Sequence, residues 1–151
     1  MSLQFETLGV LSIDMGVSHT VGDTPTGSRR MAAFAGGTFE GPRLNALVLQ
    51  GGSDLILTRR DQSFHPDARL MLKTGDDALI LVTYRGIRHG PAEVMQRIAQ
   101  DLPVDPSDYY QRAVFSFETS VPRYDWLNRI FAIGTGRRVP RRMIYDMYEL
   151  L

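Results

Sequence analysis

The segment "ARLMLKTGDDALILVTYRG", residues 68–86, decides the fold of this chain. In its first half, apolar side chains such as Leu70 and Leu72 occur at every second position, which is the period of a β-strand with one buried face. Gly75–Asp77 then separates two apolar runs and is typical of a tight turn between antiparallel strands. Residues 78–82 are apolar on both faces, so we expect this second strand to be covered on both sides.

Runs of the same kind occur on both sides of this segment and are separated by Gly, Asp and Pro. The predicted strands are residues 5–17, 29–37, 44–50, 54–60, 68–74, 78–86, 109–119, 130–136 and 143–150. "SHTVGDTPTGS", residues 18–28, predicts a loop, and Gly51-Gly52 predicts a tight hairpin turn between its flanking strands. One short helix is expected near 91–100, because its apolar residues recur at i, i+4 spacing between two prolines.

Consecutive strands joined by short turns form antiparallel sheet, and a sheet with many strands closes or folds over because open edges are exposed. The sequence therefore predicts an all-β fold, an antiparallel β-barrel of about eight to ten strands with one short helix. The chain has 151 residues, no internal repeat and no long linker, so we expect a single β-barrel domain over residues 1–151. The interior of such a barrel is either filled by side chains or holds one small ligand.

The charge and residue content exclude several classes of protein. Lys plus Arg and Asp plus Glu number 17 each, and a formal net charge of zero argues against nucleic-acid binding. The basic segment "GRRVPRR", residues 136–142, is interpreted as a solvated hairpin. The absence of cysteine excludes disulfides, thiol nucleophiles and thiolate-bound metals. The three histidines, of which His65 is the best candidate for catalysis, lack metal-ligand spacing, so we expect no metal and no cofactor.

No apolar run approaches the roughly 18 residues that a membrane span needs. The first residues, "MSLQFETLGV", lack the basic-then-apolar pattern of a signal peptide. We therefore expect a cytoplasmic protein that binds neither membranes nor nucleic acid.

A glycine-rich segment, "GGTFEGPR" at residues 36–43, raises the alternative of a phosphate-binding loop. Such loops present consecutive backbone N–H groups and lead into a helix. Here Pro42 removes one N–H group, and the residues that follow have the pattern of a strand. We therefore expect a β-bulge or barrel corner that carries Glu40 and Arg43 toward one rim.

Six segments of the chain form an ordered set. They are "GDTPTGSRR", "GGTFEGPRL", "GGSDLILTRRD", "DARLMLKTGDDALILV", "FETSVPRYDWLN" and "FAIGTGRR". Together they resemble the bacterial and fungal family known as domain of unknown function 3237, or uncharacterised protein family 0311. The resemblance extends from residue 5 to the C-terminus. It implies an antiparallel β-barrel and no established activity.

Charged residues concentrate in and near these motifs, and two interpretations are open. In one, leucines and phenylalanines face inward and the charges face solvent. In the other, Asp, Glu and Arg form a band near one barrel mouth, where buried charges are paired through arginine. On the second interpretation the catalytic candidates are Asp67 and Glu118 for proton transfer and Arg69 as an anion clamp. The ligand-binding candidates are Glu40, Arg43, Asp54, Tyr84, Arg112, Trp126 and Asn128.

Two functions follow from this pattern, and the sequence does not decide whether the chain is an enzyme. The first is a barrel that binds a small carboxylate- or carbonyl-bearing molecule and acts on it by metal-free acid–base chemistry. The second is a non-catalytic binding or assembly module. In that case the apolar C-terminal segment "MIYDMYELL", residues 143–151, would mediate a homo-oligomer.

Overall fold

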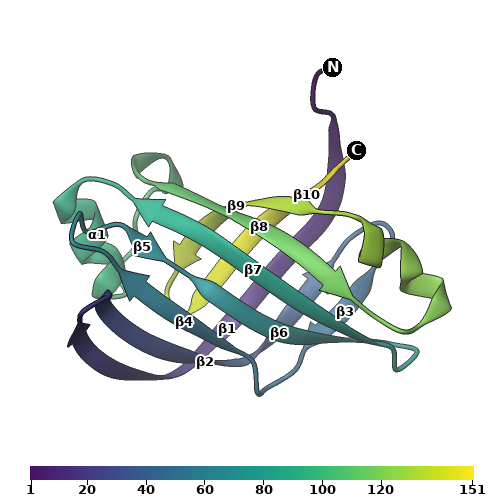
Figure 1. Ribbon diagram of the computed structural model, residues 1–151, viewed down its shortest axis with the longest axis horizontal. Coiled ribbons are helices and arrows are strands. Elements are labelled where there is room, and N and C mark those ends of the chain that lie inside the picture. The colour runs from purple at the N-terminus through teal and green to yellow at the C-terminus, as the bar shows by residue number, and fades with distance from the viewer.

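Ten antiparallel strands close into a barrel in the computed structural model, which describes residues 1–151 (Figure 1). The strands are β1 (Phe5–Thr24), β2 (Gly27–Glu40), β3 (Asn45–Val48), β4 (Ser53–Thr58), β5 (Phe64–His65), β6 (Asp67–Thr74), β7 (Leu79–His89), β8 (Tyr110–Glu118), β9 (Ala132–Val139) and β10 (Arg142–Leu150). The helical elements are α1 (Ala92–Ala99) and the 3-10 helices η1 (Pro106–Asp108) and η2 (Pro122–Arg129). The predicted all-β barrel with a short helix near 91–100 is confirmed.

The first and the last long strands pair with each other and close the barrel. β10 pairs with β9 on one edge and with β1 on the other, where Leu11 lies opposite Tyr145. The segment predicted to mediate a homo-oligomer therefore has no free edge for strand addition, and an oligomer would have to use an outer face of the barrel. No helix of the structure combines the length and the apolar character that crossing a membrane requires.

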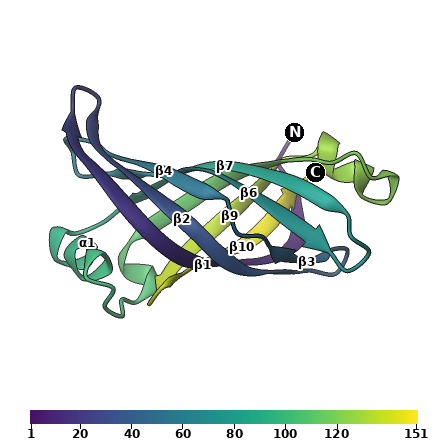
Figure 2. The ribbon, with the colours of Figure 1, turned by 90° about the horizontal axis from the view of Figure 1, so that it is seen from below.

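The loop predicted at residues 18–28 is wrong, because β1 and β2 pair through most of this segment. Ser18 lies opposite Ala32 and Thr24 lies opposite Gly27, which leaves only two residues for the turn. Figure 2 shows the two strands running together to the hairpin tip. The register shifts twice between Met15 and Gly22, and each shift changes which face the following residues occupy. The alternation that identifies a strand is therefore broken in the sequence.

The hairpin predicted at Gly51-Gly52 is also wrong. β3 and β4 do not pair with each other but lie end to end, and both pair with β2 and with β6. The 14-residue strand β2 is long enough to pair with both. The hairpin predicted at Gly75–Asp77 is confirmed, since Lys73 of β6 lies opposite Leu79 of β7.

A β-bulge, as the sequence predicts, lies where the segment "GGTFEGPR" begins. Asp14 lies opposite Gly36 and Met15 opposite Phe34, so Ala35 is the extra residue in β2. Gly37 follows with a φ of 140°, a conformation that other residues rarely adopt. A Cβ atom at this position would lie 2.0 Å from the carbonyl oxygen of Ser12. Close contact between two strands therefore requires glycine here.

Replacing Gly37 by alanine is expected to lower the free energy of unfolding by about 3 kcal/mol or more, because the new methyl group overlaps the β1 backbone and the φ angle is strained. Urea denaturation measures the loss. Gly75→Ala is the matched control, since its added methyl group meets nothing within 4 Å, and a change within about 0.5 kcal/mol is expected. Equal stability of the two variants would contradict the proposed strand contact.

The two ends of the barrel differ. Tyr124 and Leu127 of η2 are buried and cover the end opposite α1 (Figure 1). In the β6–β7 turn at this end, Asp76 accepts hydrogen bonds from Thr74 Oγ1 at 2.5 Å and Tyr124 Oη at 3.0 Å. Arg123 forms an ion pair with the same carboxylate at 3.1 Å. This end is therefore closed by packing and hydrogen bonds, and the space for a ligand lies at the other end.

Candidate functional site

Polar residues interrupt the inward-facing apolar rows at the α1 end of the barrel. On β7, Ile80, Val82 and Tyr84 are buried and the row ends in Arg88. On β8, the row that contains Phe115 begins with Gln111. Asp54 of β4, Arg30 of β2 and Arg138 of β9 belong to the same end of the barrel, because they line one pocket together with Arg88 and Gln111. Residues far apart in the sequence thus form one polar cluster inside an apolar barrel.

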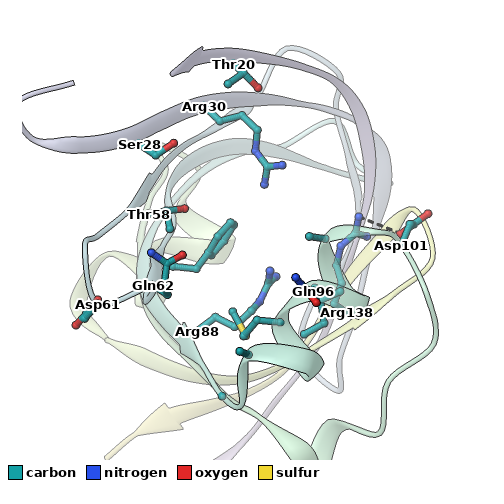
Figure 3. Close-up of a pocket in the computed structure, with 16 residues that line it drawn as sticks. Thr20, Ser28, Arg30, Thr58, Asp61, Gln62, Arg88, Gln96, Asp101 and Arg138 are labelled. Carbon is teal, nitrogen blue, oxygen red and sulfur yellow. Dashed lines mark ion pairs between the residues drawn. The ribbon is translucent and has the colours of Figure 1, made fainter. Parts of the chain in front are cut away.

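A cavity of about 710 Å³ opens at this end, between the β1–β2 hairpin, the residues around β5 and helix α1 (Figure 3). Its wall includes Phe64 together with Met95 and Ile98 of α1. A smaller pocket of about 50 Å³ shares Arg30, Phe64 and Arg88 with it and continues inward. The inner pocket reaches Asp54, Tyr84 and Tyr145. The two spaces form one site with a wide mouth and a polar inner end, within the size range of small-molecule sites.

Arg88 is a buried cation without a carboxylate partner. Arg88 is only 6% exposed, and it takes part in none of the ion pairs of the structure. Nε donates to Gln111 Oε1 at 2.7 Å, while Nη2 has only the weak acceptor Met143 Sδ at 3.7 Å. The guanidinium stacks 4.3 Å from the centre of the Phe64 ring. Burial lowers the pKa of Arg88. A buried guanidinium with free N–H groups is suited to bind an anionic oxygen.

Two further arginines lie at the mouth of the cavity. Arg30 is exposed, forms no ion pair and lies 5.8 Å from the centre of the Phe64 ring. Figure 3 shows Arg30 and Arg88 entering the opening from opposite sides. Arg138 instead lies along the wall, where it pairs with Asp101 at 3.3 Å. The site therefore contains two arginines without an ion-pair partner, Arg30 and Arg88, and a third, Arg138, that is paired with Asp101.

Asp54 is the only carboxylate at the inner end of the site, and it is 6% exposed. Oδ1 accepts the backbone N–H of Asp67 at 2.9 Å, and Oδ2 has no hydrogen-bond partner within the protein. Burial raises the pKa of Asp54 to about 6, against the opposing effects of the Asp67 N–H and of the charges on Arg88 and Arg30. A carboxyl group with this pKa exchanges a proton readily near neutral pH, as a general acid or base requires.

Two tyrosines lie beside Asp54. Tyr145 accepts a hydrogen bond from Gln111 Nε2 at 3.0 Å, and Gln111 thereby holds both Tyr145 and Arg88 in place. The Tyr84 hydroxyl forms no hydrogen bond within the protein although Tyr84 is 2% exposed. Burial raises the pKa of both tyrosines, so both hydroxyls remain protonated. Gly136 makes room for this group, because a Cβ atom there would lie 2.7 Å from both Tyr145 and Gln111.

Of the residues predicted from the sequence, only Asp54 and Tyr84 line this site. The three catalytic candidates lie outside it: Glu118 and Arg69 are exposed, and Asp67 pairs with Arg85 at 3.5 Å. Asp67 still contributes to the site through its backbone N–H group, which donates a hydrogen bond to Asp54 Oδ1. The roles predicted for Glu118 and Arg69 remain predictions that concern the outer surface.

The other ligand-binding candidates lie on the outside of the barrel or at its rims. Arg43 pairs with Glu149 at 3.0 Å and lies 3.6 Å from the centre of the Trp126 ring. Asn128 accepts from the Thr119 N–H at 2.8 Å and joins η2 to the end of β8. Glu40 and Arg112 are exposed. No ion pair joins Glu40 or Arg43 to Asp67, Arg69 or Glu118.

His65 is part of a separate hydrogen-bond chain. Ser63 Oγ donates to Asp61 Oδ1 at 2.5 Å and lies 2.7 Å from His65 Nε2. Burial lowers the pKa of His65. The Nε2–H tautomer is assigned to its neutral form because the Ser63 hydroxyl already donates to Asp61. The Ser63 hydroxyl thus donates its hydrogen bond to Asp61 and not to His65, so this trio is not arranged as a nucleophile and its base.

The sequence reasoning did not identify Arg30, Arg88, Gln111, Arg138 and Tyr145. One signal was available for Arg88 and Gln111. Each stands at the inward-facing position of its strand, at the end of an apolar row with period two. A charged or amide residue that continues a buried row predicts either a paired buried charge or a ligand site.

Comparison with known proteins places the chain among barrels of unknown function. The model of a family described as "Protein of unknown function (DUF3237)" matches residues 3–150. A UPF0311 protein of Rhodopseudomonas palustris is 33% identical over 153 residues, which covers 100% of both chains. The crystal structure of a conserved protein of unknown function from Rhodopseudomonas palustris has a TM-score of 0.96 at 29% identity, and covers 100% of this chain and 99% of that chain. A β-barrel-like protein from Acinetobacter baumannii has a TM-score of 0.87 at 37% identity, with 100% and 98% coverage.

Proposed function

This chain belongs to the DUF3237 family of proteins of unknown function, and we propose that its barrel binds a small organic acid in the cavity beside α1 and acts on it by proton transfer at Asp54. One observation carries the proposal: two unpaired arginines, Arg30 and Arg88, face the same cavity as a buried carboxyl group. A bound carboxylate or carbonyl oxygen would supply the acceptor that Arg88 lacks in the protein.

The apolar wall supports a ligand with a carbon skeleton rather than an inorganic anion. Phe64, Met95 and Ile98 line the mouth together with uncharged polar side chains. A cavity of about 710 Å³ encloses an organic molecule of many heavy atoms and leaves a single small anion mostly unsupported. Asp54 at the inner end then lies beside the bound molecule, within the same enclosed space as Arg88. This arrangement favours ligand binding and proton transfer over a purely structural barrel.

The proposal is tested with a panel of aromatic and aliphatic carboxylates, each beside its uncharged primary amide, by ligand-observed NMR. We expect the wild-type protein to bind carboxylates more tightly than the amides, and Arg30→Gln to weaken that binding about 10-fold because one charge-assisted contact is lost. Arg112→Gln is the matched control, since Arg112 is exposed on β8 and does not line the cavity.

A panel that contains no binder, or carboxylates that bind no better than their amides, would contradict the proposed site. Loss of binding in Arg112→Gln, with binding retained in Arg30→Gln, would show that the ligand binds on the outer surface of the barrel and not in the cavity. The alternative of an assembly module predicts instead that sedimentation velocity detects a stable oligomer whose formation does not depend on Arg30 or Arg88.

A further inference from the structure

Asp54 and Tyr84 flank the same small residue at the inner end of the cavity. In the sheet, Asp54 of β4 lies opposite Ala68 of β6, and Ala68 lies opposite Tyr84 of β7. All three are buried, and Asp54 and Tyr84 both line the inner pocket of about 50 Å³. Since adjacent strands are about 4.8 Å apart, the Asp54 and Tyr84 backbones are about 10 Å apart. The two side chains are therefore close enough to contact one small ligand group in the inner pocket that both of them line.

Both side chains have unused hydrogen-bonding capacity. Asp54 Oδ2 and the Tyr84 hydroxyl have no partner within the protein, whereas Tyr145 is already bound to Gln111. The free N–H groups of Arg88 belong to the same pocket. A ligand at this place therefore meets one carboxyl group that exchanges protons and two donors that stabilise negative charge on oxygen.

These three groups match the requirements of one reaction class. From this juxtaposition we infer that the ligand is an enolisable ketone that also carries a carboxylate, and that Asp54 transfers the proton on the carbon beside the ketone. Tyr84 and Arg88 bind the ketone oxygen, and Arg30 at the mouth binds the carboxylate. This inference rests on the proposed function and adds the substrate class and the reaction.

The step balances without an oxidant, a reductant or a second substrate. The Asp54 carboxylate takes the proton from the carbon, and the C–H electron pair becomes the carbon–carbon double bond of an enolate. The carbonyl π pair moves to oxygen, where the Tyr84 hydroxyl and the Arg88 guanidinium stabilise the charge. Asp54 then returns a proton either to a conjugated carbon, which isomerises the ligand, or to the same carbon, which exchanges its hydrogen with solvent.

The alternatives that the residues offer are weaker. Acyl transfer needs an activated nucleophile. The hydroxyl of Ser63, the serine beside His65, donates its hydrogen bond to Asp61 and is therefore not activated by the histidine. Cysteine is absent from the chain. Asp54 is the only carboxylate that lines the inner pocket, whereas Asp61 and Asp101 of the outer cavity are engaged by Ser63 and Arg138. The inner pocket therefore lacks the second carboxyl group that glycoside hydrolysis usually requires. A single carboxyl group paired with donors is the arrangement of proton abstraction beside a carbonyl.

The experiment follows deuterium incorporation by proton NMR in D2O, with 4-oxo-4-phenylbutanoate, 4-oxopentanoate and 2-oxobutanoate as probes. The uncharged 1-phenylbutan-1-one, which has the same ketone without the carboxylate, is the ligand control. We expect the protein to accelerate exchange at the CH2 group beside the ketone of at least one acid. Asp54→Asn should lower that rate by about 100-fold or more, and Tyr84→Phe by about 10-fold.

Arg30→Gln separates binding from chemistry, since it should raise KM for the acids about 10-fold with little change in kcat and no effect on 1-phenylbutan-1-one. Circular dichroism confirms that each variant is folded. Acids that bind without accelerated exchange would overturn this inference and leave the proposed binding site intact. Exchange that persists in Asp54→Asn would overturn the role of Asp54. Failure of every acid to bind would overturn both proposals.

Discussion

The Asp54→Asn variant is expected to be more stable than the wild-type protein above pH 6 and equally stable near pH 4. Burial raises the pKa of Asp54 from 3.8 to about 6, so the folded protein binds this proton more tightly than the unfolded chain. The stabilisation by the protonated carboxyl group is fully present below the pKa that Asp54 has in the unfolded chain. It is lost as the pH rises through the pKa that Asp54 has in the folded protein. At pH 7 the ionised group then destabilises the fold by up to about 3 kcal/mol.

Asparagine resembles the protonated carboxyl group and keeps an oxygen for the Asp67 N–H. Urea denaturation of both proteins from about pH 4 to about pH 8 measures the difference, which should grow from near zero to at most about 3 kcal/mol in favour of the variant. A variant that is less stable than the wild-type protein at the higher pH would show that the charge on Asp54 is compensated in the folded state.

Asp61→Asn is the control of opposite sign. The Ser63 hydroxyl and backbone N–H lower the pKa of Asp61, so its contribution to stability is present above the ordinary pKa and is lost as the pH falls. Asp61→Asn should therefore be less stable than the wild-type protein at neutral pH, and the difference should shrink on acidification. The same trend in both variants would point to a general effect of charge rather than to the two sites.

Arg88→Met is expected to weaken the binding of an organic acid, measured by titration calorimetry, by about 10- to 100-fold. The variant should remain folded. Methionine fills a similar volume beside Phe64 and Met143, and it removes a buried charge that lacks a carboxylate partner. The lost guanidinium leaves Gln111 Oε1 without its donor, which offsets part of that gain. The free energy of unfolding should therefore change by less than about 2 kcal/mol.

Arg85→Gln provides the comparison on the same strand, because the side chain of Arg85 is 78% exposed on the outer face of β7. Its affinity for the acid should equal that of the wild-type protein. Arg88→Lys should recover only part of the affinity, since an ammonium group reproduces neither the stacking on Phe64 nor the planar fork. Full affinity in Arg88→Met would exclude Arg88 from the site.

The period-two pattern was sufficient to predict most of this fold. Residues 68–86 form the hairpin of β6 and β7, and the closed antiparallel barrel and helix α1 are as predicted. The family membership expected from the six motifs is confirmed by the match over residues 3–150. The errors at residues 18–28 and at Gly51-Gly52 have a common cause, because glycine in a bulged or interrupted strand has the same sequence signature as glycine in a turn.

The site was harder to predict, because its polar residues come from six strands, β2, β4, β7, β8, β9 and β10, and meet only when the barrel closes. The sequence predicts Asp54 and Tyr84 as site residues, and both line the pocket. It also predicts catalytic roles for Glu118 and Arg69 from their charge, and the structure places both at the surface. Charge alone does not distinguish the two faces of a strand. The position of a charged or polar residue within a period-two row does identify the inward face. Arg88 and Gln111 both continue buried apolar rows of their strands.

The seam between β1 and β10 determines when the cavity is completed during folding. Leu11 lies opposite Tyr145, so the first strand of the nascent chain cannot complete its pairing until the last strand, β10, has left the ribosome. Contacts so distant in sequence form slowly, and the exposed edge of β1 is prone to aggregation until β10 arrives. Tyr145 and Met143, which line the inner pocket, are delivered by that same strand. A ligand of the proposed site would therefore bind only the fully assembled barrel.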